Sequence, residues 1–141
     1  MAQQRIEYEE LTPGYEFAPT SYRLDGKTVI DYLRATGDDS RFYEEEKIAP
    51  PMVIAALAMA AMSSKIGLPA GAIHISQELE FVNIATIGEV LTSHARVNRR
   101  VERGKFHMLT IGINVENSRK ATVMTGESSF TLPSAVEERA R

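Results

Sequence analysis

The sequence has 141 residues, of which 43% are hydrophobic and 25% are charged, values typical of one soluble globular domain. Its formal net charge of -3 excludes the broad basic surface that nucleic-acid-binding proteins carry. The absence of cysteine excludes disulfides, thiolate catalysis and cysteine-ligated zinc. We therefore expect a single domain over residues 1–141.

The first ten residues, MAQQRIEYEE, lack the apolar stretch of a signal peptide. The most apolar stretch, residues 48–61, is too short to span a bilayer and is soon followed by polar residues. We expect a cytoplasmic protein with no membrane partner and no nucleic-acid partner.

The first part of the chain predicts one strand and one helix. Residues 15–24 form a plausible short strand after the turn sequence Thr-Pro-Gly. In residues 25–39, Val29, Ile30 and Leu33 fall on one helical face, and Asp25 can cap the N terminus of that helix.

Residues 50–66 predict a longer helix that begins on two prolines. Proline is tolerated in a first turn, because its missing N–H would have no partner there. Gly67 and Pro69 do not continue a helix easily and mark its end. The segment of three glutamates before the prolines, residues 44–46, is expected to be a solvated loop.

After Gly71 the pattern becomes extended. Four strands are expected, at residues 72–82, 89–102, 105–117 and 120–133, joined by connections of hairpin size. In the first of them, one face is expected to carry Ile73, Ile75, Gln77, Leu79 and Phe81, and the other His74, Ser76, Glu78 and Glu80. The tail, residues 134–141, is expected to be frayed or weakly helical.

The long helix is apolar on all sides, which is typical of a buried helix. Its alanines would let strands approach the helix backbone closely, and its methionines would fill irregular gaps. A buried helix followed by a meander of long strands predicts an α+β hotdog fold, in which a curved antiparallel sheet wraps a central helix.

The chain resembles MaoC-like hotdog proteins in six segments that occur in the same order: TPGYEF, VIDYLRATGDDSRFY, IAPPMVIAALAM, GAIHISQELEF, TIGEVL and TGESSFTLP. That family includes (R)-specific enoyl-CoA hydratases and hydroxyacyl dehydratases, and the resemblance extends from Leu11 to Pro133. The sequence IAPPM is most similar to the branch named for the fungal fatty-acid-synthase-like dehydratase domain. That branch often pairs a non-catalytic hotdog with a catalytic one.

The hydratase motif of this family, Gly-Asp-x-Asn-Pro-x-His, falls here on GDDSRFY, residues 37–43. The resemblance implies that Asp38 activates the water that adds to a 2,3 double bond. Tyr43 stands at the histidine position, and a phenol with a pKa of about 10 is a poor general base at neutral pH. Tyr43 can still hydrogen-bond a water, and His74 is a candidate replacement base. The alternative interpretations are a turn aspartate, a packed tyrosine and a structural or interface histidine.

Three further departures from the family pattern concern the substrate site. Catalytic members have a longer segment between the histidine and the helix than this chain has after Tyr43. Met59 falls where some members carry a serine. Pro51 falls where a backbone N–H, commonly of a glycine, polarises the thioester carbonyl, and proline has no N–H to donate. Met52 can take that role if the acyl group lies one residue deeper. We expect Pro51, Met52 and Met59 to line the substrate site.

Four basic residues surround a hairpin tip: Arg99, Arg100, Arg103 and Lys105. They form either a solvated turn or a contact to the phosphates of coenzyme A or an acyl-carrier arm, for which Arg99 and Arg100 are the candidates. His94 and His107 are expected to face solvent. No histidine pair has metal-ligand spacing, so we expect no metal and no cofactor besides the carrier of the thioester.

An open five-stranded sheet has an edge to cover, and the resemblance implies a dimer with ligand tunnels at its interface. We expect residues 72–81 to form the seam of a homodimer, or of a heterodimer with a catalytic hotdog partner. Two functions remain open: a hydratase or dehydratase acting on a 2-enoyl thioester, and a non-catalytic subunit that binds the acyl chain. Thioesterase activity is a weaker third option.

Overall fold

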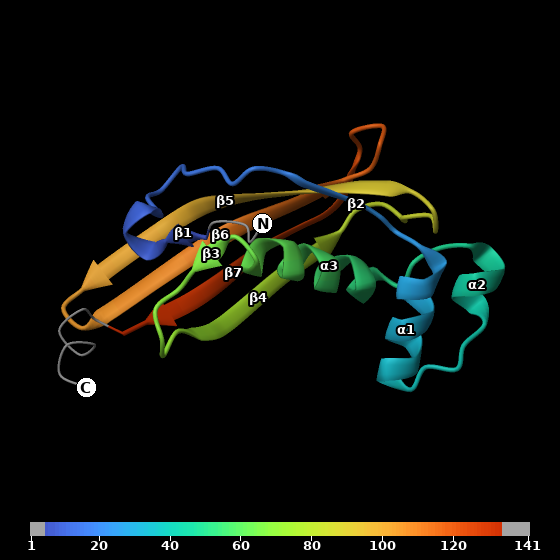
Figure 1. Cartoon of the computed structure of the whole chain (residues 1–141), viewed down its shortest axis with the longest axis horizontal. Coiled ribbons are helices and arrows are strands. Elements are labelled where there is room, and N and C mark those ends of the chain that lie inside the picture. The colour runs from blue at the N-terminus through green and yellow to red at the C-terminus, as the bar shows by residue number, and fades with distance from the viewer. Residues whose placement is uncertain (1–4, 134–141) are drawn as a thin grey trace.

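The computed structural model describes residues 5–133, and its main feature is a five-stranded antiparallel sheet with a helix along one face (Figure 1). The helices are α1 (Gly26–Thr36), α2 (Phe42–Glu46) and α3 (Pro51–Ser63), with a short 3-10 helix at Tyr8–Glu10. The strands of the large sheet are β2 (Thr20–Arg23), β4 (Ile73–Phe81), β5 (Val90–Arg103), β6 (Phe106–Glu116) and β7 (Thr122–Leu132). Two further strands, β1 (Ile6–Glu7) and β3 (Ile66–Gly67), form a small parallel pair.

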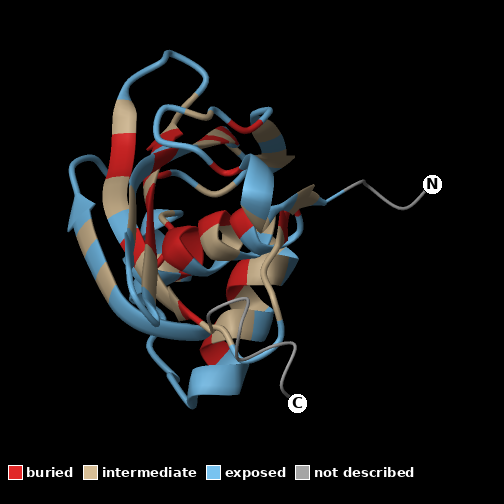
Figure 2. Cartoon of the chain, turned by 90° about the vertical axis from the view of Figure 1, so that its left-hand side faces the viewer, coloured by how far each residue is buried: buried red, intermediate tan, exposed pale blue. Residues whose placement is uncertain are grey.

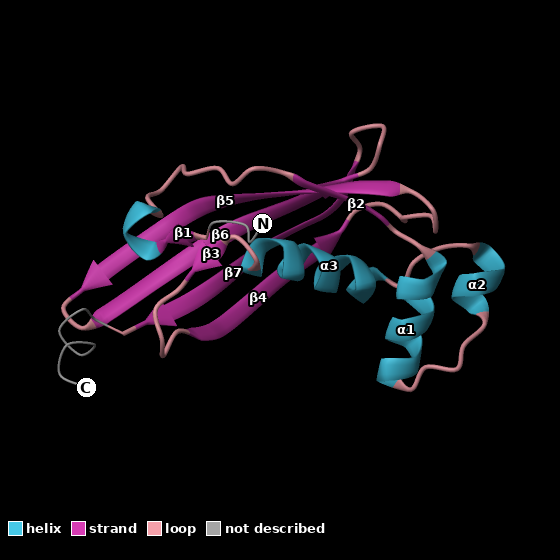
Figure 3. Ribbon diagram, viewed as in Figure 1, coloured by secondary structure: helices cyan, strands magenta, loops and turns pink. Residues whose placement is uncertain are grey.

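The strand order of the large sheet is β2-β5-β6-β7-β4, so β4 is an edge strand that pairs with β7 alone. Alternate residues of β6 face α3, and those residues, Leu109, Ile111, Ile113 and Val115, are at most 4% exposed. Figure 3 shows α3 crossing this inner face, while α1 and α2 lie beyond one end of the sheet. This is the predicted arrangement of an apolar helix against a curved sheet.

The helix α3 is shorter than residues 50–66, because the chain passes into β3 at Ile66 and pairs there with β1. Its buried residues are Val53, Ile54, Ala55, Ala58 and Met62. The expectation that α3 is covered on all sides is wrong for the single chain. Met52 is 50% exposed, and Ala56 and Ala60, one and two turns further along the same stripe, are also exposed. Figure 2 shows buried segments on both the helices and the strands.

The predicted helix after Asp25 is confirmed. The Asp25 carboxylate accepts a hydrogen bond from the Thr28 N–H at 2.8 Å, as an N-cap does. Gly37 ends α1 in the left-handed conformation, with a φ of 71°. The strand predicted at residues 15–24 is only four residues long, and Glu16 contributes an isolated bridge to Arg96 instead.

Two local features differ from the sequence predictions. Residues 44–46, expected as a loop, belong to the short helix α2, which ends where Lys47 adopts a φ of 55°. The alternation predicted for β4 is broken by a bulge between His74 and Ser76. The bulge turns His74 to the inner face, beside Phe130, and Ile73 to the outer face, so the two residues exchange faces relative to the prediction.

Among the described residues, no helix combines the length and the apolar composition that crossing a bilayer requires. The tail predicted as frayed or weakly helical lies outside the described residues.

Candidate functional site

The N-terminal end of α3 lies next to α1 and α2 (Figure 1). The linker into α3 is fixed by a hydrogen bond from the Ala49 N–H to the Ala85 carbonyl at 2.9 Å, in the segment after β4. Pro51 has no N–H, and the Val53 N–H donates to the Pro50 carbonyl at 3.0 Å. No acceptor for the Met52 N–H is found in residues 5–133. That N–H is therefore the donor left for a carbonyl oxygen at the positive end of the helix dipole.

Asp38 is exposed and follows the end of α1. Its carboxylate Oδ1 accepts a hydrogen bond from the Ser40 N–H at 2.9 Å, and its own N–H donates to the Leu33 carbonyl at 2.9 Å. The Ser40 hydroxyl in turn accepts from the Phe42 N–H at 3.2 Å. Asp38 thus closes the turn between α1 and α2. These are the contacts of a turn aspartate, the alternative interpretation in the sequence analysis.

Tyr43 lies on α2 and is half-buried against the core. Its ring packs edge-on against Phe42, with 5.4 Å between ring centroids. Its carbonyl accepts from the Ile48 N–H at 3.1 Å, which joins α2 to the linker before α3. Across the described part of the chain, no hydrogen bond links the Tyr43 hydroxyl to Asp38. Tyr43 therefore has the contacts of a packed aromatic residue.

His74 lies at the opposite end of the sheet. It stacks on Phe130 with 4.8 Å between ring centroids, at the start of β4. The end of β4, at Phe81, is the end that leads to the N terminus of α3. Phe81 lies seven positions after His74 along this strand, a separation of about 23 Å. One chain therefore does not bring His74 to Asp38, and a second chain would have to supply any such pair.

Met59 contacts a buried serine that hydrogen-bonds a half-buried glutamine, a pair that the sequence analysis missed. The Ser128 hydroxyl on β7 is fully buried, donates to Gln77 Oε1 at 2.6 Å and lies 3.3 Å from Met59 Sδ. The Gln77 amide group donates to the carbonyls of Glu78 and Glu127 at 3.1 and 3.2 Å. A hydroxyl is thus present beside Met59, supplied by the sheet instead of the helix. The sequence signal that could have revealed this contact was a serine, Ser128, on the otherwise apolar inner face of β7.

Arg100 is occupied by contacts within the chain. Its guanidinium lies 4.0 Å from the Tyr8 ring centroid, donates to the Tyr8 carbonyl at 2.9 Å and pairs with Glu102 at 2.8 Å. Burial and the hydrogen bond to Glu102 raise the pKa of Tyr8. Hydrogen bonds from Arg100 and Tyr8 lower the pKa of Glu102. This arrangement speaks against a phosphate contact for Arg100, whereas Arg99 is exposed.

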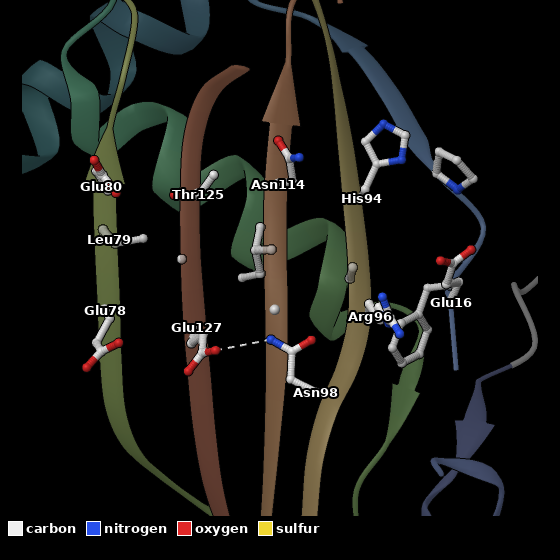
Figure 4. A pocket seen from close by; sticks show the side chains of 16 residues that line it. Glu16, Glu78, Leu79, Glu80, His94, Arg96, Asn98, Asn114, Thr125 and Glu127 are labelled. Atoms are coloured by element: carbon white, nitrogen blue, oxygen red, sulfur yellow. Dashed lines mark hydrogen bonds between the residues drawn. The ribbon is translucent and has the colours of Figure 1, made fainter. Parts of the chain in front are cut away.

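The outer face of the sheet, away from α3, contains an open groove of about 800 Å³ (Figure 4). The groove is lined by charged and amide side chains, among them Glu78, Glu80, Glu127, Arg96 and Asn98. Asn98 donates to Glu127 at 3.1 Å. His94, expected to face solvent, is only partly exposed, with its Nε2 2.6 Å from a carboxylate oxygen of Glu116. None of the catalytic candidates lines this groove.

No group of three or more histidine, aspartate or glutamate side chains with the spacing of a metal site occurs within residues 5–133.

The sequence profile described as "FAS1-like, dehydratase domain region" matches residues 12–126. The chain belongs to this dehydratase-region family. The predicted branch is therefore confirmed. A search among curated proteins gave no match.

Solved structures extend the comparison for this dehydratase-region protein. The unliganded R-hydratase PhaJ1 from Pseudomonas aeruginosa has a TM-score of 0.77 and 22% identity, covering 92% of this chain and 86% of PhaJ1. The (R)-hydratase of A. caviae involved in PHA biosynthesis has a TM-score of 0.73 and 20% identity, covering 89% and 99%. The ChsH1–ChsH2 complex from Mycobacterium tuberculosis has a TM-score of 0.70 and 14% identity, covering 86% and 98%. These similarities confirm the α+β hotdog fold.

Proposed function

We propose that this protein is one subunit of a hotdog pair that reversibly hydrates a 2-enoyl thioester of coenzyme A or of an acyl carrier protein. In this proposal the chain binds the acyl group, and a partner hotdog supplies the aspartate and histidine that activate water. The observation that carries the proposal is the use of Asp38 to close a turn, with no hydrogen bond between Asp38 and a histidine among the described residues.

The chemistry of hydration needs a base within hydrogen-bond reach of the attacking water. Asp38 lacks the partner that orients and activates such a water, because Tyr43 packs on Phe42 and His74 lies at the other end of β4. A carboxylate alone can hold a water but has no second group to deliver the proton. These placements favour a binding role over autonomous catalysis.

The acyl-binding role rests on the open side of α3. Met52 presents its unpaired N–H and a half-exposed side chain at the start of this stripe, and Ala56 and Ala60 continue it. A thioester carbonyl at the Met52 N–H would place the acyl chain along these small residues. Water would be excluded from this stripe only when a second subunit covers it.

Pairing is supported by the edge strand β4 and by the similarity to ChsH1–ChsH2, which is itself a complex of two chains. The unpaired side of β4 and the segment after it expose large apolar side chains: Ile73 at 60%, Ile75 at 49%, Phe81 at 39% and Val82 at 50%. An uncovered strand edge with this much apolar surface is typical of an interface.

A second candidate function is hydration by this chain alone, with Asp38 as base and Tyr43 as weak acid. It is favoured by one observation, namely that Asp38 is exposed at the α3 end of the molecule together with the free Met52 N–H.

The test is hydration of crotonyl-CoA and of a longer 2-enoyl-CoA by the purified chain alone, and then with a hotdog chain that carries the intact aspartate–histidine motif and co-purifies with it. We expect no turnover by this chain alone, and a higher rate for the pair than for the partner alone. Turnover by this chain alone would support the second candidate. Inactivity of every combination would contradict both.

A further inference from the structure

The edge strand β4 carries charge of one sign on its outer face. Glu78 and Glu80 are both exposed there, on the side away from α3 (Figure 4). Glu78 lies directly opposite Glu127 of β7, which adds a third carboxylate to the same surface. Among the described residues, none of these three glutamates forms an ion pair, and the Glu127 carboxylate accepts a side-chain hydrogen bond only from the neutral Asn98.

A second copy of the chain would double this charge. In a two-fold antiparallel pair of β4 strands, directly opposite residues lie on the same face of the sheet. Glu78 would then face Glu78, Glu80 or Ser76 of the copy, depending on the register. In the first two registers all four carboxylates of Glu78 and Glu80 occupy opposite or diagonal positions, where like charges are destabilising. In the register that places Glu78 opposite Ser76, only the two Glu78 carboxylates are diagonal neighbours, so the repulsion is weaker.

The exposed apolar residues of β4 favour contact with a partner, and the charges of Glu78 and Glu80 determine which partner strand fits. A partner strand that carries lysine or arginine on its outer face would meet Glu78 and Glu80 as cross-strand ion pairs. The same partner would cover Ile75 and Phe81, which a copy of this chain would cover only against that repulsion.

We propose that β4 selects against a second copy of this chain and pairs with a different protein whose edge strand presents basic side chains opposite Glu78 and Glu80. This inference rests on the pairing through β4 in the proposed function, and it adds the charge of the partner. Selection by a repulsive element is a known route to specificity between otherwise similar strands.

The experiment uses the double variant E78K/E80K as the partner, because its β4 strand presents basic side chains at the two positions where the wild-type strand presents glutamates. Equal amounts of the wild-type chain and a mass-tagged E78K/E80K chain are mixed at low salt, and their dimers are measured by native mass spectrometry. We expect the mixed dimer to exceed the statistical mixture by about tenfold, because both homodimers oppose like charges. The preference should decrease as salt is raised.

The matched control is E45K/E46K, which changes the charge equally on exposed residues of α2, away from β4. It should give a statistical mixture with the wild-type chain. As a second readout, E78Q/E80Q should self-associate about tenfold more tightly than the wild-type chain.

A statistical mixture for E78K/E80K, or an unchanged self-association of E78Q/E80Q, would overturn the inference while leaving pairing through β4 intact. The absence of any dimer would overturn the pairing as well. Neither readout depends on hydration, so an inactive protein would leave the inference standing.

Discussion

Ser128 shows how a single polar side chain constrains the inner face of the sheet. It is fully buried, and its hydroxyl satisfies Gln77 Oε1 at 2.6 Å while contacting Met59. Replacing it by alanine would leave the Gln77 oxygen without this donor. We expect Ser128→Ala to lower the free energy of unfolding by about 1–3 kcal/mol, measured by urea denaturation. Ser21→Ala, which removes an exposed hydroxyl pair, should change stability by less than about 0.5 kcal/mol. Equal effects of the two variants would contradict the account.

Glu102 provides a pH-dependent test at the same scale. Hydrogen bonds from Arg100 and Tyr8 lower its pKa in the folded chain, so its carboxylate stabilises the fold above the unfolded pKa of about 4.3. That contribution is lost as the pH falls through the lower folded pKa. The stability difference between wild type and Glu102→Gln should be largest near neutral pH, at less than about 1 kcal/mol for this half-exposed pair, and should shrink in acid. A difference that is constant with pH would show that the hydrogen bonds do not act through ionisation.

At the scale of elements, the attachment of β4 depends on Gly126. A Cβ atom there would lie 2.4 Å from the Glu78 carbonyl oxygen, so an alanine would force β4 away from β7. We expect Gly126→Ala to destabilise the chain by about 1–3 kcal/mol in chemical denaturation. Gly112→Ala on β6 is the matched control, because its Cβ would meet the side chain of Asn98, which can rotate away. A larger loss of stability for Gly112→Ala than for Gly126→Ala would contradict the view that the β4–β7 contact depends on Gly126.

Periodicity predicted most elements because each is decided by its own side chains. The caps Asp25 and Gly37 fix α1, and the period-2 patterns of β5, β6 and β7 fix the long strands. The short helix α2 carries no side-chain cap, and its end depends on the conformation of Lys47. Local sequence therefore gave no signal for it.

The candidate site was only partly predictable, because its geometry depends on contacts between residues that lie far apart in the sequence. The bulge between His74 and Ser76 depends on the register of β4 against β7 and reverses the face of His74. The contact of Ser128 with Gln77 joins residues 51 positions apart. The structure shows Asp38 in a turn, the alternative to the catalytic role that the motif implied, and its distance from His74 follows from where β4 begins and ends.

At the scale of the whole molecule, the single chain is incomplete on one side. The open stripe of α3 and the uncovered edge of β4 support the proposed second subunit, and the outer charge of β4 supports the proposal of a partner of opposite sign. In the proposed pair, this chain would contribute one side of the acyl-binding site and a carbonyl-binding N–H, and the partner would contribute the acid–base chemistry.

The most direct test of the proposed roles of the two subunits uses the assembly of this chain that hydrates a 2-enoyl-CoA. The hydration rate of that assembly is measured with wild-type Asp38 and with Asp38→Asn. We predict equal kcat values within about twofold, because the proposed pair has its base on the partner. A catalytic Asp38 would lower kcat by about 10²–10⁴-fold, and a decrease of that size would contradict the account.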